Sequence, residues 1–175
     1  MTVHLSRSAL FAAALALVAL AGFLRWRAAT ADERRVRRVF AKVERLAEKR
    51  GPDANPVFEA FVVRELAELL DAVVELRAPE LGGRVWRERR EELAREAYAA
   101  KSRATGLSLR FYDLDVAFPA EGRATAVGEA RLSGALPEFG GAFDDTREVE
   151  VALRRDGSSG RWLVRRVEVR PVARK

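Results

Sequence analysis

The sequence contains no cysteine, and its single histidine is His4. Without cysteine the chain has no disulfide, no thiolate nucleophile and no sulfur-ligated metal. A lone histidine at the N-terminus excludes a histidine-based mechanism in the rest of the chain, including Ser/His/Asp triads and the usual histidine-containing metal sites. No glycine-rich phosphate loop or acidic metal cluster occurs either. We therefore predict neither a metal nor a cofactor.

The positive charge is concentrated at one end of the chain. Residues 1–50 carry 11 Lys/Arg against 4 Asp/Glu, whereas residues 51–175 carry 21 against 22. A nucleic-acid-binding domain needs its cations on the folded surface, where they neutralise phosphates. Here the excess flanks an apolar segment instead, so we predict no nucleic-acid partner.

That apolar segment is residues 9–24, which contain 16 consecutive apolar residues. As a helix it would be about 24 Å long, at the short end of a membrane span. A cleaved signal peptide is the alternative, but Arg25 and Arg27 lie before the small residues at which cleavage would occur. We expect residues 1–8 to be a tail, 9–27 an uncleaved single-pass membrane anchor, 28–172 one domain and 173–175 a tail.

The side of the membrane on which the domain lies stays open. More cations follow the span than precede it, which slightly favours a cytoplasmic domain by the positive-inside rule, yet similar anchored domains also occur on the exported side. The cations between Arg34 and Arg50 could alternatively bind anionic lipid headgroups.

The first half of the domain has the spacing of helices. Thr30 and Glu33 form a capping box, and apolar residues then recur every three or four positions as far as Gly51-Pro52. A second helix is predicted from Pro56 to about Asp71. A short strand over residues 72–79 and a third helix over residues 84–103 follow.

From Gly106 the apolar period changes to two, which is typical of strands. We predict strands over residues 106–120, 123–136, 148–153 and 162–169, with residues 137–145 as a loop. The alternation slips at Tyr112-Asp113, which indicates a β-bulge, and slips again before Val167. Helices followed by strands are the plan of an α+β domain.

This order of elements, with the closing motif Gly160-x-Trp162-x-Val164, resembles the nuclear transport factor 2-like (NTF2-like) superfamily, which includes the SnoaL-like cyclases and the ketosteroid isomerases. Membrane-anchored bacterial members with an arginine-rich link are also similar to this chain. Over residues 31–172 the resemblance implies a cone in which three helices pack inside a strongly bent antiparallel sheet. It also implies a possible homodimer through the outer face of the sheet.

The same resemblance implies a hydrophobic pocket at the open end of the cone. Candidate lining residues are the large apolar side chains that the predicted elements turn inward, although any one of them could simply fill the core. They are Phe58, Phe61, Leu76, Trp86, Tyr98, Phe111, Phe118 and Trp162.

Enzymes of this superfamily place an aspartate inside the cone, and the candidates for that role are Asp71 and Asp113. Glu75 and Asp115 are further acid–base candidates, and Tyr98 and Tyr112 could donate hydrogen bonds. Each of the four carboxylates could equally be a solvated polar residue. Two functions follow. The first is a membrane-tethered, non-catalytic module that binds a small hydrophobic ligand or a protein partner. The second is an isomerase or cyclase that uses one buried carboxylate, Asp71 or Asp113.

Overall fold

The computed structural model describes residues 30–49, 56–136 and 141–172. The chain divides into two compact units, Met1–Arg34 and Arg35–Lys175, and the second unit is described below. The expected membrane anchor, residues 9–27, lies outside the described residues. Within the described ranges, no helix is long and apolar enough to cross a membrane.

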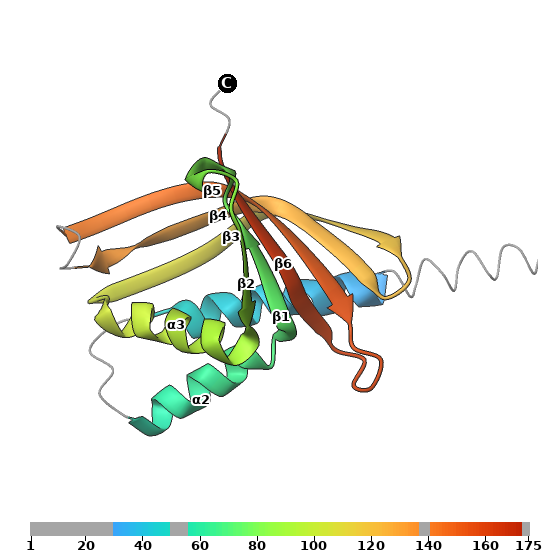
Figure 1. The fold of residues 1–175 in the computed structure, drawn as a ribbon, viewed down its shortest axis with the longest axis horizontal. Helices are drawn as coiled ribbons and strands as arrows, with labels where there is room; N and C mark the ends of the chain where they lie inside the picture. Colours follow the sequence, from blue (N-terminus) through green and yellow to red (C-terminus); the bar gives the residue numbers. More distant parts are fainter. Residues whose placement is uncertain (1–29, 50–55, 137–140, 173–175) are drawn as a thin grey trace, which may run out of the picture. The chain divides into compact units, whose positions relative to one another are not determined.

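The second unit combines helices with one large sheet (Figure 1). A helix over residues 30–47 enters it. The other elements are α2 (Pro56–Ala67), β1 (Leu70–Arg77), a 3₁₀ turn (Pro79–Leu81), β2 (Val85–Arg89), α3 (Arg90–Arg103), β3 (Gly106–Ala120), β4 (Arg123–Leu136), β5 (Gly141–Arg155) and β6 (Trp162–Pro171). The sheet order is β2-β1-β6-β5-β4-β3. The α+β class is confirmed, but the expected antiparallel sheet is mixed, because β1 pairs with β6 in parallel.

The core lies between the first helix and one face of the sheet. The helix contributes Val36, Val39, Phe40 and Leu46, the three- and four-residue stripe read from the sequence. Ala124 and Ala126 on β4 are small, so the larger helix side chains can pack closely against the strand. The sheet side of the core is completed by Leu69, Val74, Val151, Leu153, Trp162 and Val164.

The third helix is shorter than predicted, because residues 85–89 form strand β2. Trp86, expected on the inner face of a helix, instead pairs with Leu76 of β1. Alternate β2 residues are half-buried and exposed, which is the period of a strand. Four of the five residues of β2 are charged or exposed, so apolar and polar residues do not alternate clearly in the sequence, and the strand could not be predicted from that alternation.

Two other boundaries were also wrong. α2 ends at Ala67, and β1 begins at Leu70, inside the stretch predicted as helix. β5 begins at Gly141 rather than at residue 148, because Gly141 pairs with Leu136 and the β4–β5 ladder continues to the end of both strands. Residues 141–145 of the predicted loop, and residues 146–147 after it, are therefore strand.

The predicted bulge in β3 is confirmed. Pairing with β4 shifts between Tyr112 and Asp115, and Asp113 has a positive φ of 50°. Gly128 lies opposite the bulge, where a Cβ would come within 2.7 Å of the Tyr112 carbonyl oxygen. The absence of a side chain at Gly128 therefore allows the bulge to approach β4.

Candidate functional site

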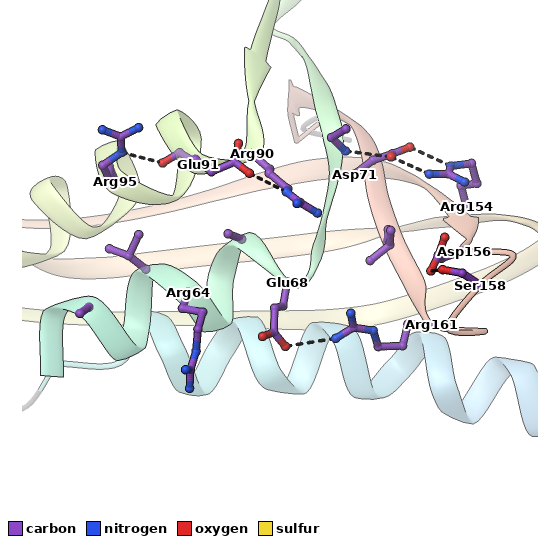
Figure 2. Close-up of a pocket in the computed structure, with 15 residues that line it drawn as sticks. Arg64, Glu68, Asp71, Arg90, Glu91, Arg95, Arg154, Asp156, Ser158 and Arg161 are labelled. Carbon is purple, nitrogen blue, oxygen red and sulfur yellow. Dashed lines mark hydrogen bonds and ion pairs between the residues drawn. The ribbon is translucent and has the colours of Figure 1, made fainter. Parts of the chain in front are cut away.

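An open hollow of about 890 Å³ lies where α2, the start of α3, β1 and the β5–β6 turn come together. Figure 2 shows α2 along one side and the strand ends along the other. One part of its lining is apolar, formed by Ala60, Val63, Ala67, Ala72 and Leu163. The rest is charged or polar, formed by Arg64, Glu68, Asp71, Arg90, Glu91, Arg95, Arg154, Asp156, Ser158 and Arg161.

Asp71 and Arg154 form the most extensive ion pair of the hollow (Figure 2). Arg154 donates from Nε to Oδ2 at 2.9 Å and from Nη2 to Oδ1 at 2.7 Å. The backbone N–H of Ala72 also donates to Oδ1, at 2.8 Å. The guanidinium lowers the pKa of Asp71, and the carboxylate raises the pKa of Arg154. Asp71 is therefore ionised at neutral pH.

Two further arginines of the hollow contact carboxylates. Arg161 pairs with Glu68 at 3.1 Å, and Arg90 donates to Glu91 at 2.8 Å. Arg95 donates to the backbone carbonyl of Glu91 rather than to its carboxylate. The lining holds five arginines against four carboxylates, so one positive charge is not balanced within it.

Asp156 begins the turn that closes this side of the hollow. Its Oδ2 accepts hydrogen bonds from the hydroxyls of Ser158 and Ser159 at 2.7 and 2.5 Å, and from the Ser159 backbone N–H at 3.0 Å. The side-chain hydrogen bond from Ser159, followed by that from Ser158, holds the pKa of Asp156 well below its ordinary range. The turn is therefore organised by its own side chains.

We expect Asp71→Asn to lower the free energy of unfolding by about 1 kcal/mol at neutral pH, because it removes a two-point ion pair that is only partly exposed. The folded-state pKa of Asp71 lies below the ordinary value of 3.8. Its contribution is therefore present above that pH and is lost as the pH falls through the folded pKa. Urea unfolding of both chains should give curves that converge in acid. A difference that does not change with pH would contradict this assignment.

The residues predicted to line a hydrophobic pocket lie in several places. Phe58 and Phe61 are exposed on α2, with ring centroids 6.5 Å apart. Leu76 and Trp86 pair across β1 and β2 and are half-buried, and Tyr98 is buried on α3. Phe111 packs against Phe40 at 5.0 Å, and Phe118 packs against Trp162 at 5.8 Å. Trp162 also lines a second hollow beside the first helix. As ligand contacts, all eight stay predictions.

Of the predicted acid–base candidates, Asp71 alone is among the residues that line the large hollow. Asp113, Asp115 and Tyr112 are exposed on the bulge of β3. Glu75 accepts from Arg77 and pairs with Arg87 at 3.5 Å, and these arginines lower the pKa of Glu75.

Sequence reasoning missed the arginine partners of the hollow. Asp71 and Arg154 are 83 positions apart, and Glu68 and Arg161 are 93 apart. No local spacing reveals pairs of this kind, because they form only once β6 has paired with both β1 and β5.

The chain matches no protein-family model and no curated protein. It is similar in structure to the Kfla4162 protein from Kribbella flavida, with 11% identity, a TM-score of 0.65 and coverage of 84% of this chain and 95% of that one. An NTF2-like protein with a cystatin-like fold from Novosphingobium aromaticivorans has 18% identity, a TM-score of 0.60 and coverage of 91% and 92%. A protein from the same organism, provisionally named as a scytalone dehydratase, has 13% identity, a TM-score of 0.63 and coverage of 83% and 96%.

Likenesses at such low identity establish the fold and not the activity. The described part of the chain has the NTF2-like fold expected from its order of elements.

Proposed function

We propose that this chain uses its NTF2-like fold as a non-catalytic binding module, and that the large hollow takes a small, mainly apolar molecule with one acidic group. The single positive charge left unbalanced among the hollow's residues carries this proposal. The hollow has a volume of about 890 Å³, which is in the range of small-molecule sites. The apolar side formed by α2 and Leu163 would cover the body of the ligand, and the arginines would hold its acidic group.

The state of Asp71 supports a binding role over a catalytic one. A general base that works near neutral pH needs a carboxylate with a raised pKa. The pKa of Asp71 is lowered instead, because Arg154 donates to both of its oxygens. As part of the same proposal, residues 9–27 would hold the module at a membrane. Binding of a protein partner, or of a second copy of this chain, to the sheet stays a prediction.

An isomerase or cyclase that uses Asp71 is the second candidate. It is favoured by one observation, that a largely buried carboxylate lies in the wall of the hollow. For this role the substrate would have to draw Arg154 away from Asp71. Asp113 supports the enzyme less well, because it is exposed on the bulge.

Native mass spectrometry of the full chain, released from a nonionic detergent, tests the binding proposal. We expect a copurifying organic acid, or an adduct with added naphthoate, which has an apolar ring system and one carboxylate. Ala60→Trp should weaken naphthoate binding about tenfold or more, because the indole would occupy the hollow. Ala99→Trp, on the exposed surface of α3, is the matched control and should bind as the unmodified chain does.

No bound mass in the unmodified chain, or naphthoate binding retained in Ala60→Trp, would overturn the proposal. Asp71→Asn separates the two candidates. A binding module would keep its ligand and bind naphthoate at least as tightly, because the variant removes a negative charge from the lining, whereas an enzyme would lose the conversion of a bound substrate to product in the same spectra.

A further inference from the structure

A third hollow, of about 410 Å³, lies on the sheet, over β1, β4, β5 and β6. On β4, Ala124 and Ala126 are buried in the core, so Thr125 between them is on the opposite face. Thr125 pairs directly with Ala152 of β5. Two small residues side by side leave a depression that the longer side chains around them surround.

Those surrounding side chains are mainly arginines. The hollow is lined by Arg77, Arg123, Arg154, Arg165 and Arg166 against one carboxylate, Glu75. Arg77 pairs with Glu75 and Arg154 pairs with Asp71. Arg166 donates from Nη2 to Glu150 at 2.8 Å. Within the described part of the chain, the side chains of Arg123 and Arg165 contact no carboxylate. The excess of positive charge is therefore larger here than in the first hollow.

The strand register places Arg123 and Arg165 where their charges form no ion pair with the described residues. Arg123 lies directly opposite Arg154 on the paired strands, and like charges in that position destabilise a sheet. Val164 pairs with Leu153 of β5 and Arg166 pairs with the adjacent Ala152, so Arg165 between them is the extra residue of a bulge. Arg166 Nε is buried without a hydrogen-bond partner in the described residues. An anion held among these side chains would relieve the repulsion and could accept from the buried donor.

We propose that this hollow is a binding site for a small dianionic oxyanion of the phosphate class. Guanidinium groups bind such oxygens through paired N–H donors, and the register brings Arg123, Arg166 and the Thr125 hydroxyl to the same hollow. A tetrahedral oxyanion presents oxygens in several directions, so it can be reached by donors from more than one strand. The source is either free inorganic phosphate or the phosphoryl group of a small phosphomonoester.

Isothermal titration of the full chain in nonionic detergent tests the site, with inorganic phosphate and glucose phosphate as separate probes and with chloride at matched ionic strength. We expect saturable binding of at least one phosphate probe and none of chloride. Arg123→Gln and Arg165→Gln should each weaken that binding about tenfold, the loss of one charge-assisted contact. Arg84→Gln is the matched control, because Arg84 is exposed in the turn before β2, and it should leave the affinity unchanged.

Binding of both probes identifies the phosphoryl group itself as the ligand, and binding of glucose phosphate alone identifies the phosphomonoester as the source. Arg123 does not line the large hollow, so naphthoate binding to Arg123→Gln should be unchanged, and this variant shows whether the two sites fail independently. The proposal is overturned if neither probe binds, if chloride matches them, or if Arg84→Gln weakens binding as much as the other two variants do.

Discussion

Replacing Trp162 with alanine should lower the free energy of unfolding by about 3–5 kcal/mol, the usual cost of removing a large aromatic side chain from a core. Trp162 is 4% exposed on β6, and its ring lies 5.8 Å from that of Phe118. The side chain belongs to the cluster formed by the first helix and the sheet. Urea unfolding followed by far-ultraviolet circular dichroism measures the change.

Trp162→Phe is the informative control. Trp162 Nε1 is buried without a hydrogen-bond partner in the described residues, so the indole N–H contributes a desolvation cost that phenylalanine lacks. We therefore expect Trp162→Phe to lose much less stability than Trp162→Ala. An alanine variant as stable as the unmodified chain would show that the side chain does not fill the core.

The sequence predicts the fold best where burial differs sharply along an element. Val36, Val39 and Phe40 are buried between exposed arginines, so their helical spacing is plain in the sequence. The motif around Trp162 is equally clear, since Trp162 and Val164 enter the core while Leu163 lines the large hollow. In both cases the local pattern and the tertiary packing agree.

The prediction fails where partners distant in the sequence decide the structure. Residues 85–89 are strand because β1 offers them an edge, although their own composition fits a charged helix equally well. The candidate site likewise depends on residues that are distant from one another in the sequence. Arg154 was not predicted to be part of it, because its role depends on Asp71, which lies near it only because β6 pairs with both β1 and β5.

Two buried lysines connect the ends of two helices through hydrogen bonds to backbone carbonyls. Lys49 and Lys101 are 7% and 4% exposed. Lys49 Nζ donates to the backbone carbonyls of Lys101 and Ser102 at the end of α3, at 3.2 and 2.7 Å. Lys101 Nζ donates to the carbonyl of Leu46 at the end of the first helix, at 2.9 Å. Lys49, which follows the first helix, thus donates to the C-terminal end of α3, and Lys101 of α3 donates to the C-terminal end of the first helix. A positive charge is favourable at a helix C-terminus, because the last carbonyls lack partners within the helix.

Lys49→Met and Lys101→Met should each lower the free energy of unfolding by about 1–3 kcal/mol, because methionine preserves the apolar stem but removes a buried ammonium donor from helix-end carbonyls. Lys49→Met removes the donor to the Ser102 carbonyl, and Lys101→Met removes the donor to the Leu46 carbonyl. Urea unfolding of both variants measures the two losses. Lys42→Met is the control from the same helix; its amine pairs with Glu65 at a partly exposed position, so its loss should matter much less. If either core variant proved as stable as Lys42→Met, the two lysines would not be the caps that hold these helix ends together.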